Sequence, residues 1–178
     1  MQSNFEGRAD MKNTAEAYFP LFVDLSDKKI VVIGAGNIAS RRVKILADFC
    51  ADITVAAPEA SGEILSMEAA GRIKLLRKPY EKSDIKGAFI VLAAADDAAL
   101  NRQIYDDCKK EGIIVNAASD KSLCDFYFPG IVKKDSMVVG ISASGTAHKK
   151  AHLVREACAA AIETVMSKEQ DDQCGINY

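Results

Sequence analysis

Two glycines and an alanine form the stretch of the sequence that points most clearly to chemistry. The apolar run Lys29–Ile33 leads directly into Gly34–Ala39, which reads G-x-G-x-x-A, and an amphipathic segment follows. Strand, tight turn and helix in that order are the context in which this pattern indicates dinucleotide binding. Gly34 permits the turn, Gly36 lets the backbone approach a pyrophosphate, and Ala39 lets helix and strand pack closely. The free N–H groups at the helix N-terminus would bind the phosphates. An ordinary turn rich in small residues is the alternative.

Two further segments should contribute to the same site, because ligands of open α/β sheets bind beyond the carboxyl ends of the strands. Small side chains at Ala94 and Ala95 leave room for a nucleotide after one apolar run. After another, the backbone groups of Pro58 and Glu59 are expected near the adenosine. NAD sites usually carry an acidic residue at the end of the second strand. Here the nearest acidic residue, Glu59, comes later in the chain, and there is no arginine cluster of the kind that binds a 2′-phosphate. The sequence therefore favours NAD and leaves NADP open.

A third segment, Asn116–Lys121, follows an apolar run and is expected near a nicotinamide. Asp120 carries the ionisable group best placed for acid–base chemistry, which needs a carboxylate within hydrogen-bond reach of a substrate. Asn116 and Lys121 are candidate substrate contacts in the same segment. The alternative for Asp120 is a cap on a local turn.

Hydroxyl groups and cations gather in the second half of the chain. Ser142, Ser144 and Thr146 precede a predicted helix and form an anion-friendly N-terminus, with plain helix capping as the alternative. His148 and His152 lie four residues apart, but no third ligand accompanies them, so no metal site is predicted. An excess of lysines in this half suggests an anionic ligand, unless it is simply a solvated surface.

Hydrophobic periodicity predicts the elements that position these groups. Strands are expected at residues 29–33, 52–57, 73–76, 88–93 and 113–116, and helices at 37–49, 61–70 and 98–111. The most apolar strand, 88–93, is expected near the sheet centre. Asp96 or Asp97 should cap the helix that follows it, and Gly112 should end that helix. The order of elements predicts an α/β fold with a Rossmann-type, doubly wound parallel sheet.

The remainder of the chain is expected to form a smaller region. Residues 126–132 and 137–142 read as two strands joined by a turn, and a helix is expected at 147–167. Two strands cannot bury their own faces, so this β-hairpin and helix are predicted to form a dimer interface, with extra strands on the main sheet as the alternative. The expected divisions are a flexible arm (1–16), a Rossmann domain (17–118) whose sheet edge packs against Tyr18–Val23, and a dimerisation and substrate-binding region (119–178).

Bulk properties exclude several classes of protein. The chain has 178 residues and a net charge of −2, which gives no electrostatic case for nucleic acid or a membrane surface. No apolar run approaches the roughly 18 residues of a membrane span, and the polar N-terminus does not resemble a signal peptide. Five widely spaced cysteines indicate reduced thiols rather than a disulfide framework. A cytoplasmic protein is therefore expected.

Four motifs in order resemble the siroheme-synthase N-terminal family. They are Tyr18-Phe19-Pro20-Leu21-Phe22, Ala94-Ala95-Asp96-Asp97, Leu123-Cys124-Asp125-Phe126-Tyr127-Phe128-Pro129 and Ile141-Ser142-Ala143-Ser144-Gly145-Thr146. The resemblance implies a homodimer that uses NAD to oxidise precorrin-2 to sirohydrochlorin. Some family members also insert ferrous iron. The resemblance also implies that four residues contact the cofactor, namely Asn37, Ile38, Pro58 and Glu59. It further implies that the lysines in the second half of the chain bind the carboxylates of a tetrapyrrole.

The chain departs from the family pattern at the position of the catalytic aspartate. That aspartate lies three residues after the strand asparagine, and Ser119 stands there in this sequence, with Asp120 one place later. Ala143 replaces the second serine of the family's hydroxyl-rich motif. Ser119 and Asp120 are therefore the candidate catalytic residues, and ferrochelatase activity stays open. A non-catalytic dinucleotide-binding module that senses redox state is the alternative function.

Overall fold

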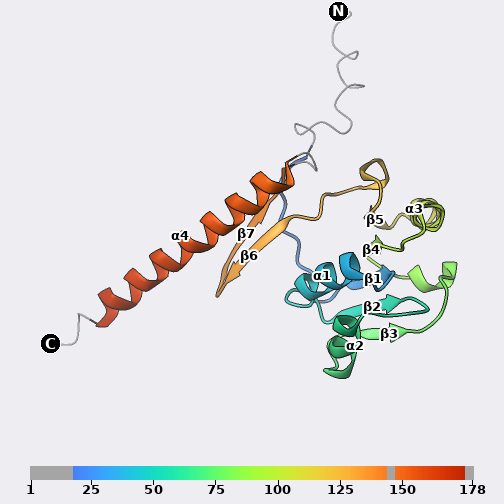
Figure 1. Cartoon of the computed structure of the whole chain (residues 1–178), viewed down its shortest axis with the longest axis horizontal. Helices are drawn as coiled ribbons and strands as arrows, with labels where there is room; N and C mark the ends of the chain where they lie inside the picture. The colour runs from blue at the N-terminus through green and yellow to red at the C-terminus, as the bar shows by residue number, and fades with distance from the viewer. Residues whose placement is uncertain (1–17, 144–146, 175–178) are drawn as a thin grey trace, which may run out of the picture. The chain divides into compact units, whose positions relative to one another are not determined.

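The structure is a computed structural model that describes residues 18–143 and 147–174. The chain divides into two compact units (Figure 1). One unit is Leu21–Tyr127, and the other includes the described residues from Phe128 onward. The arm expected at residues 1–16 lies outside the described residues. No helix among the described residues is long and apolar enough to cross a membrane.

The first unit is built on a five-stranded parallel sheet in the order β3-β2-β1-β4-β5. Its strands are β1 (Lys29–Ile33), β2 (Asp52–Ala56), β3 (Lys74–Leu76), β4 (Ile90–Ala93) and β5 (Ile114–Ala117). The doubly wound sheet predicted from the periodicity is confirmed. Strand β1 occupies the middle of the sheet, and the more apolar β4 lies beside it as an interior strand, in agreement with its expected place near the centre.

Helices cover both faces of this sheet. They are α1 (Asn37–Leu46), α2 (Gly62–Ala69) and α3 (Ala98–Glu111), with short 3₁₀ turns η3 (Lys82–Ile85) and η4 (Lys121–Leu123). The strand order reverses direction after β3, so right-handed crossovers place α1 and α2 on one face and α3 on the other. Asp97 caps α3, and Gly112 ends it in the left-handed conformation, as expected.

Alternation along β1 distributes its side chains between two cores. Val31 and Ile33 lie in one buried cluster with Ile104 and Cys108 of α3. Ile30 and Val32, which are also fully buried, point to the opposite face because successive strand residues alternate. Burial on both faces explains why the strand reads as a continuous apolar run.

The second unit contains an antiparallel hairpin and a long helix. Strands β6 (Gly130–Lys134) and β7 (Met137–Ile141) pair with each other, and α4 (His148–Cys174) lies along them (Figure 1). The hairpin forms its own sheet, so it does not extend the parallel sheet. Helix α4 continues seven residues past the expected end at Ser167, through lysine, glutamate and glutamine, which are good helix formers.

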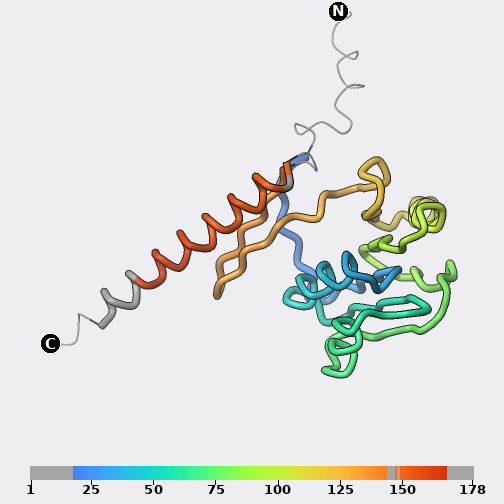
Figure 2. The backbone as a smooth tube through the Cα atoms, in the orientation of Figure 1, coloured from blue at the N-terminus to red at the C-terminus, as the bar shows by residue number. Residues whose placement is uncertain are grey.

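The first unit extends further along the chain than the boundary expected at residue 118 (Figure 2). Asn116 makes an isolated antiparallel bridge with Cys124, and the Asp125 backbone N–H donates to Val115 at 2.8 Å. Residues up to Tyr127 are therefore tied to β5. For the same reason β6 begins at Gly130 rather than at residue 126.

The segment before β1 also differs from the expectation. Tyr18–Val23 forms no regular element, and Phe22 is 73% exposed. Leu21 is exposed as well, so these apolar residues do not pack against the sheet edge.

Candidate functional site

The strand register brings four loops to one edge of the parallel sheet. Ile33 at the end of β1 pairs with Ala56 of β2 and Ala93 of β4, and Ala93 pairs with Ala117 of β5. These four strands therefore end side by side. The loops that follow them, together with the first turn of α1, carry every cofactor residue that the sequence suggested, and ligands of open α/β sheets bind at this edge.

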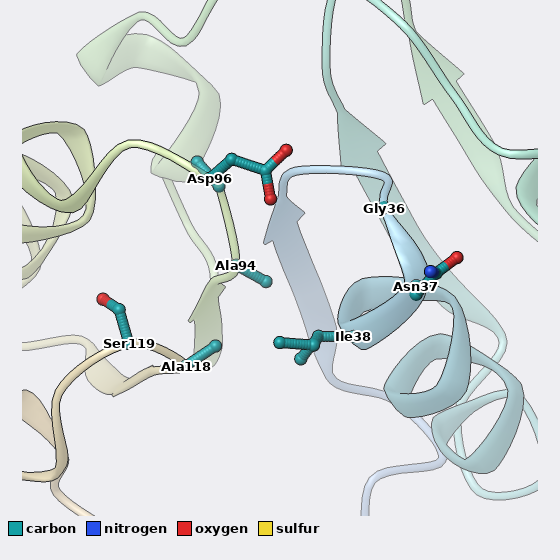
Figure 3. Close-up of a pocket in the computed structure, with 8 residues that line it drawn as sticks. Gly36, Asn37, Ile38, Ala94, Asp96, Ala118 and Ser119 are labelled. Atoms are coloured by element: carbon teal, nitrogen blue, oxygen red, sulfur yellow. The ribbon is translucent and has the colours of Figure 1, made fainter.

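A pocket of about 530 Å³ opens between the loops after β1, β4 and β5. Its volume lies within the roughly 300–1,000 Å³ typical of ligand sites. In Figure 3 the side chains of Ile38, Ala94 and Ala118 point toward one another across it, while Asn37 points away. The residues that line it are Gly36, Asn37, Ile38, Ala94, Ala95, Asp96, Ala118 and Ser119.

The pocket therefore brings together most of the predicted cofactor residues. A second, largely apolar hollow of about 190 Å³ is lined by Gly34, Pro58 and Ala95, among others. Glu59 is exposed and lines neither hollow. Because Asp97 caps α3, the neighbouring Asp96 carboxylate is left to line the pocket.

Gly34 allows β1 and the loop after β4 to approach closely. Its φ is +108°, and a Cβ there would lie 2.3 Å from the carbonyl oxygen of Ala94 and 2.8 Å from the nitrogen of Ala95. Both the backbone angle and the lack of space require glycine. Gly36 differs, since its φ is −80° and a Cβ would meet nothing within 4 Å.

The N-terminus of α1 is the one that lacks a side-chain cap among the three helices of this unit. Ser61 caps α2 and Asp97 caps α3, whereas Gly36 offers no side chain to α1, whose first turn contains no acid. The first N–H groups of an uncapped helix, together with the positive end of its dipole, form a ready site for phosphate oxygens.

A serine pair holds the glycine turn in place. The Ser40 hydroxyl lies 2.9 Å from the carbonyl oxygen of Gly36, to which it donates, and 2.7 Å from the Ser61 hydroxyl. The Ser61 backbone N–H donates to Ala35 at 3.0 Å. The turn is thus tied to the start of α2 before any ligand binds.

Asn116 is buried, and its side-chain amide is hydrogen-bonded to other groups of the protein. Its Oδ1 accepts from the Arg42 guanidinium at 2.7 Å, and its Nδ2 donates to the carbonyl of Phe126 at 2.7 Å. Burial lowers the pKa of Arg42. Asn116 does not line the pocket, and its contacts hold the loop after β5.

Asp120 and Ser119 lie next to each other but face different surroundings. One Asp120 carboxylate oxygen accepts from the backbone N–H and the hydroxyl of Ser122, at 2.8 Å and 2.7 Å. These hydrogen bonds lower the pKa of Asp120. Asp120 therefore caps the η4 turn, does not line the pocket and is ionised at neutral pH, whereas Ser119 lines the pocket.

Of the other predicted substrate contacts, Lys121 belongs to the same unit as the pocket but does not line it. Lys121 is exposed at the start of η4, and Ser142 is exposed in the second unit. Ser144 and Thr146 lie outside the described residues. His152 lies near Glu156 and Arg155 on α4. The residues that the structure describes hold no group of three potential metal ligands.

Sequence reasoning missed Asn101, whose side chain is fully buried behind the pocket. Its amide contacts both Ala95 and Ser119. The signal was present in the helical spacing, because Asn101, Ile104 and Cys108 share one buried stripe of α3. A polar residue on such a stripe needs hydrogen-bond partners.

Comparison with known proteins identifies relatives of this arrangement. Residues 21–130 match the family model NAD_binding_7, described as "Putative NAD(P)-binding". The siroheme synthase of Psychrobacter sp. (strain PRwf-1) is 40% identical over 148 residues, covering 83% of this chain and 30% of that protein. Siroheme synthase 1 of Cronobacter sakazakii (strain ATCC BAA-894) is 36% identical over 139 residues, covering 78% and 30%.

A solved structure extends the comparison to the fold. SirC, a precorrin-2 dehydrogenase, superposes with a TM-score of 0.72 at 26% identity, covering 81% of this chain and 70% of that chain. The chain spans about 30% of the length of the curated siroheme synthases that it matches. The matched model covers most of the chain, and these matches agree with the four ordered motifs. The chain therefore belongs to the siroheme-synthase N-terminal family, and its parallel-sheet unit is the NAD(P)-binding part of that family.

Proposed function

We propose that this protein oxidises precorrin-2 to sirohydrochlorin with NAD, as a step of siroheme biosynthesis. The uncapped N-terminus of α1, at the rim of the 530 Å³ pocket, is the observation that carries the proposal. The relatives named siroheme synthase and the structural likeness to a precorrin-2 dehydrogenase support the choice of substrate.

The residues of the pocket fit a dinucleotide. Gly36 leaves open space beside the first turn of α1, where the pyrophosphate would meet free N–H groups. Small side chains at Ala94, Ala95 and Ala118 leave room along the opposite wall. The apolar hollow beside Pro58 suits the adenosine, and Glu59, the next residue along the chain, remains a candidate contact.

The reaction requires this chain mainly to bind and orient two partners. NAD, when bound, supplies the hydride acceptor, and one proton leaves the substrate for each hydride transferred. In the proposal Ser119 contacts the reacting pair inside the pocket. The adjacent residue Asp120, which is ionised, is the candidate proton acceptor. Lys121 is the candidate partner of a substrate carboxylate. Ser142, Ser144 and Thr146 remain candidate contacts to the substrate.

The decisive experiment incubates the purified protein with precorrin-2 and NAD, in the absence of oxygen, and follows sirohydrochlorin and NADH by absorbance. Equal amounts of both products are expected. Binding of NAD without turnover would instead favour the non-catalytic redox-sensing module, which Ser119 at the usual aspartate position motivates. A parallel arm with NADP resolves cofactor choice, and an arm with ferrous iron tests metal insertion.

Asp120→Asn is expected to lower turnover at least about tenfold, the low end of the loss of an acid–base group. Asparagine keeps an oxygen that can accept from Ser122, so the variant removes the negative charge and retains the turn cap. Ser122→Ala is the matched control, because it removes the hydroxyl partner and keeps the carboxylate. The measurement is kcat for precorrin-2 in both variants. Equal rates in wild type and Asp120→Asn would mean that Asp120 takes no part in proton transfer and has only a structural role.

The second unit is proposed to form a homodimer. A two-stranded hairpin with one helix buries little by itself, and Ile162 is its single buried apolar residue among those described. Leu153 is 66% exposed on α4, and Val154 and Val165 are also largely exposed. Covering these apolar side chains with a second copy would supply the missing core.

Leu153→Asp is therefore expected to shift the protein from dimer to monomer, because a buried unpaired carboxylate opposes association. Sedimentation velocity at several concentrations measures the change in mass. Leu65→Asp, the same substitution at an exposed position of α2 in the first unit, controls for the added charge. A wild-type protein that sediments as a monomer would contradict the proposal.

A further inference from the structure

The Asn101 side chain lies behind the pocket wall and uses its amide to join two loops. Its Oδ1 accepts from the Ala95 backbone N–H at 3.0 Å. Its Nδ2 donates to the Ala95 carbonyl at 2.8 Å and to the Ser119 hydroxyl oxygen at 3.1 Å. The residue is fully buried in the first turns of α3. One side chain thus holds the loop after β4 and the loop after β5 together.

The orientation of this amide is fixed by chemistry. The Ala95 N–H can only donate and the Ala95 carbonyl can only accept, so the amide oxygen must face the first and the nitrogen the second. The second proton on Nδ2 then points at Ser119. Exchanging the amide oxygen and nitrogen would break both bonds to Ala95.

That orientation sets the polarity of the Ser119 hydroxyl. Its oxygen accepts from Asn101, so its own proton is available to another acceptor. Figure 3 shows Ser119 on the same wall as Ala94 and Asp96, across the pocket from α1. Ser119 is also the single hydroxyl among the lining side chains. A ligand oxygen that accepts a hydrogen bond fits this donor.

We infer that Asn101 is a positioning residue that presents the Ser119 hydroxyl to the pocket as a hydrogen-bond donor to a ligand oxygen. The inference rests on the proposed function for the identity of the ligand. Two oxygens have the required chemistry, a carboxamide oxygen on the cofactor and a carboxylate oxygen on the substrate.

A double-mutant cycle tests the inference. Ser119→Ala removes the hydroxyl from an exposed position, and Asn101→Asp keeps the shape of the side chain but replaces the donor with an acceptor. The carboxylate would draw the Ser119 proton toward itself and away from the pocket. Each variant is expected to weaken ligand binding by roughly two- to tenfold, the range for one neutral hydrogen bond. Because Asn101→Asp also loses the bond from Nδ2 to the Ala95 carbonyl, it should still reduce binding in the Ser119→Ala background, but by less than in the wild type.

Titration calorimetry with NAD and the KM for precorrin-2 separate the two ligand oxygens. A loss in NAD affinity assigns the bond to the cofactor, and a loss confined to KM assigns it to the substrate. The inference is overturned if Ser119→Ala changes neither value. It is also overturned if Asn101→Asp costs the same with and without the Ser119 hydroxyl, since a purely structural role would give that result.

Folding of the variants and the orientation of the Ser119 hydroxyl are checked by two further measurements. Circular dichroism checks folding, and Asn101→Ser, which is too short to reach Ser119, takes the place of Asn101→Asp if the buried carboxylate prevents folding. NMR of the ligand-free protein follows one Asn101 side-chain N–H proton, which should shift in Ser119→Ala. Absence of NAD binding by the wild type would overturn the proposed function. An unshifted proton would overturn the orientation of Ser119.

Discussion

Gly34→Ala is expected to destabilise the protein by roughly 2–5 kcal/mol. A residue with a Cβ costs roughly 1–2 kcal/mol in a left-handed backbone conformation. The methyl group would also lie 2.3 Å from the carbonyl oxygen of Ala94, which directly follows β4, a strand held by β1 on one side and β5 on the other. Overpacking of this kind typically costs about 1–3 kcal/mol more.

Thermal unfolding followed by circular dichroism measures the effect, and a loss of about 3 kcal/mol corresponds to roughly 6–12 °C in Tm. Gly112→Ala is the matched control, because Gly112 has a φ of +69° while a Cβ there would meet nothing within 4 Å. The control isolates the cost of the backbone angle. If both variants lose the same stability, the contact between Gly34 and Ala94 contributes nothing.

Gly34 shows what a local sequence pattern can predict and what it cannot. The G-x-G-x-x-A pattern correctly placed a turn and a helix start, since these depend on residues close together in the chain. The contact of Gly34 with Ala94 joins residues 60 positions apart and exists only because β1 pairs with β4. A local pattern predicts that a glycine is needed there and cannot identify the neighbour that excludes a side chain.

The same limit applies to the candidate site. The sequence suggested Asn116 as a substrate contact, and it could not show that the amide also binds Arg42 and Phe126, one of them 74 residues away. Asn101 went unnoticed because its partners lie in two other loops. Ser119 and Asp120 are neighbours in sequence, yet they differ in role. Ser119 lines the pocket, whereas Asp120 caps the η4 turn and does not line the pocket.

Element boundaries were predicted best where capping residues mark them. Asp97 and Gly112 bound α3 at the expected positions. The region after β5 lacks such marks, and there Cys124 bridges Asn116 and the Asp125 N–H donates to Val115, so the hairpin starts later than expected. The apolar segment at Leu21 and Phe22 was expected to pack against the sheet edge, but it is exposed, because apolar composition alone does not specify a partner.

Gly36→Asp is expected to lower NAD affinity at least about a hundredfold while leaving stability unchanged or slightly raised. The extended backbone at Gly36 and the open space beside it accept a side chain without strain. Aspartate is a preferred N-cap, gains a few tenths of a kcal/mol over glycine, and interacts favourably with the helix dipole by about 0.3–1 kcal/mol. The same carboxylate would occupy the N–H groups that the pyrophosphate needs.

Repulsion between that carboxylate and a phosphate oxygen at ~4 Å amounts to about 4 kcal/mol per charge pair at an effective dielectric of ~20. Gly36→Asn is the matched control, because asparagine caps the helix equally well without a charge. Calorimetric titration with NAD should therefore give the order wild type, Gly36→Asn, Gly36→Asp, and added salt should shrink the gap between the two variants. Wild-type affinity in a stable Gly36→Asp protein would mean that the phosphates bind elsewhere, and the assignment of α1 as the dinucleotide site would fail with it.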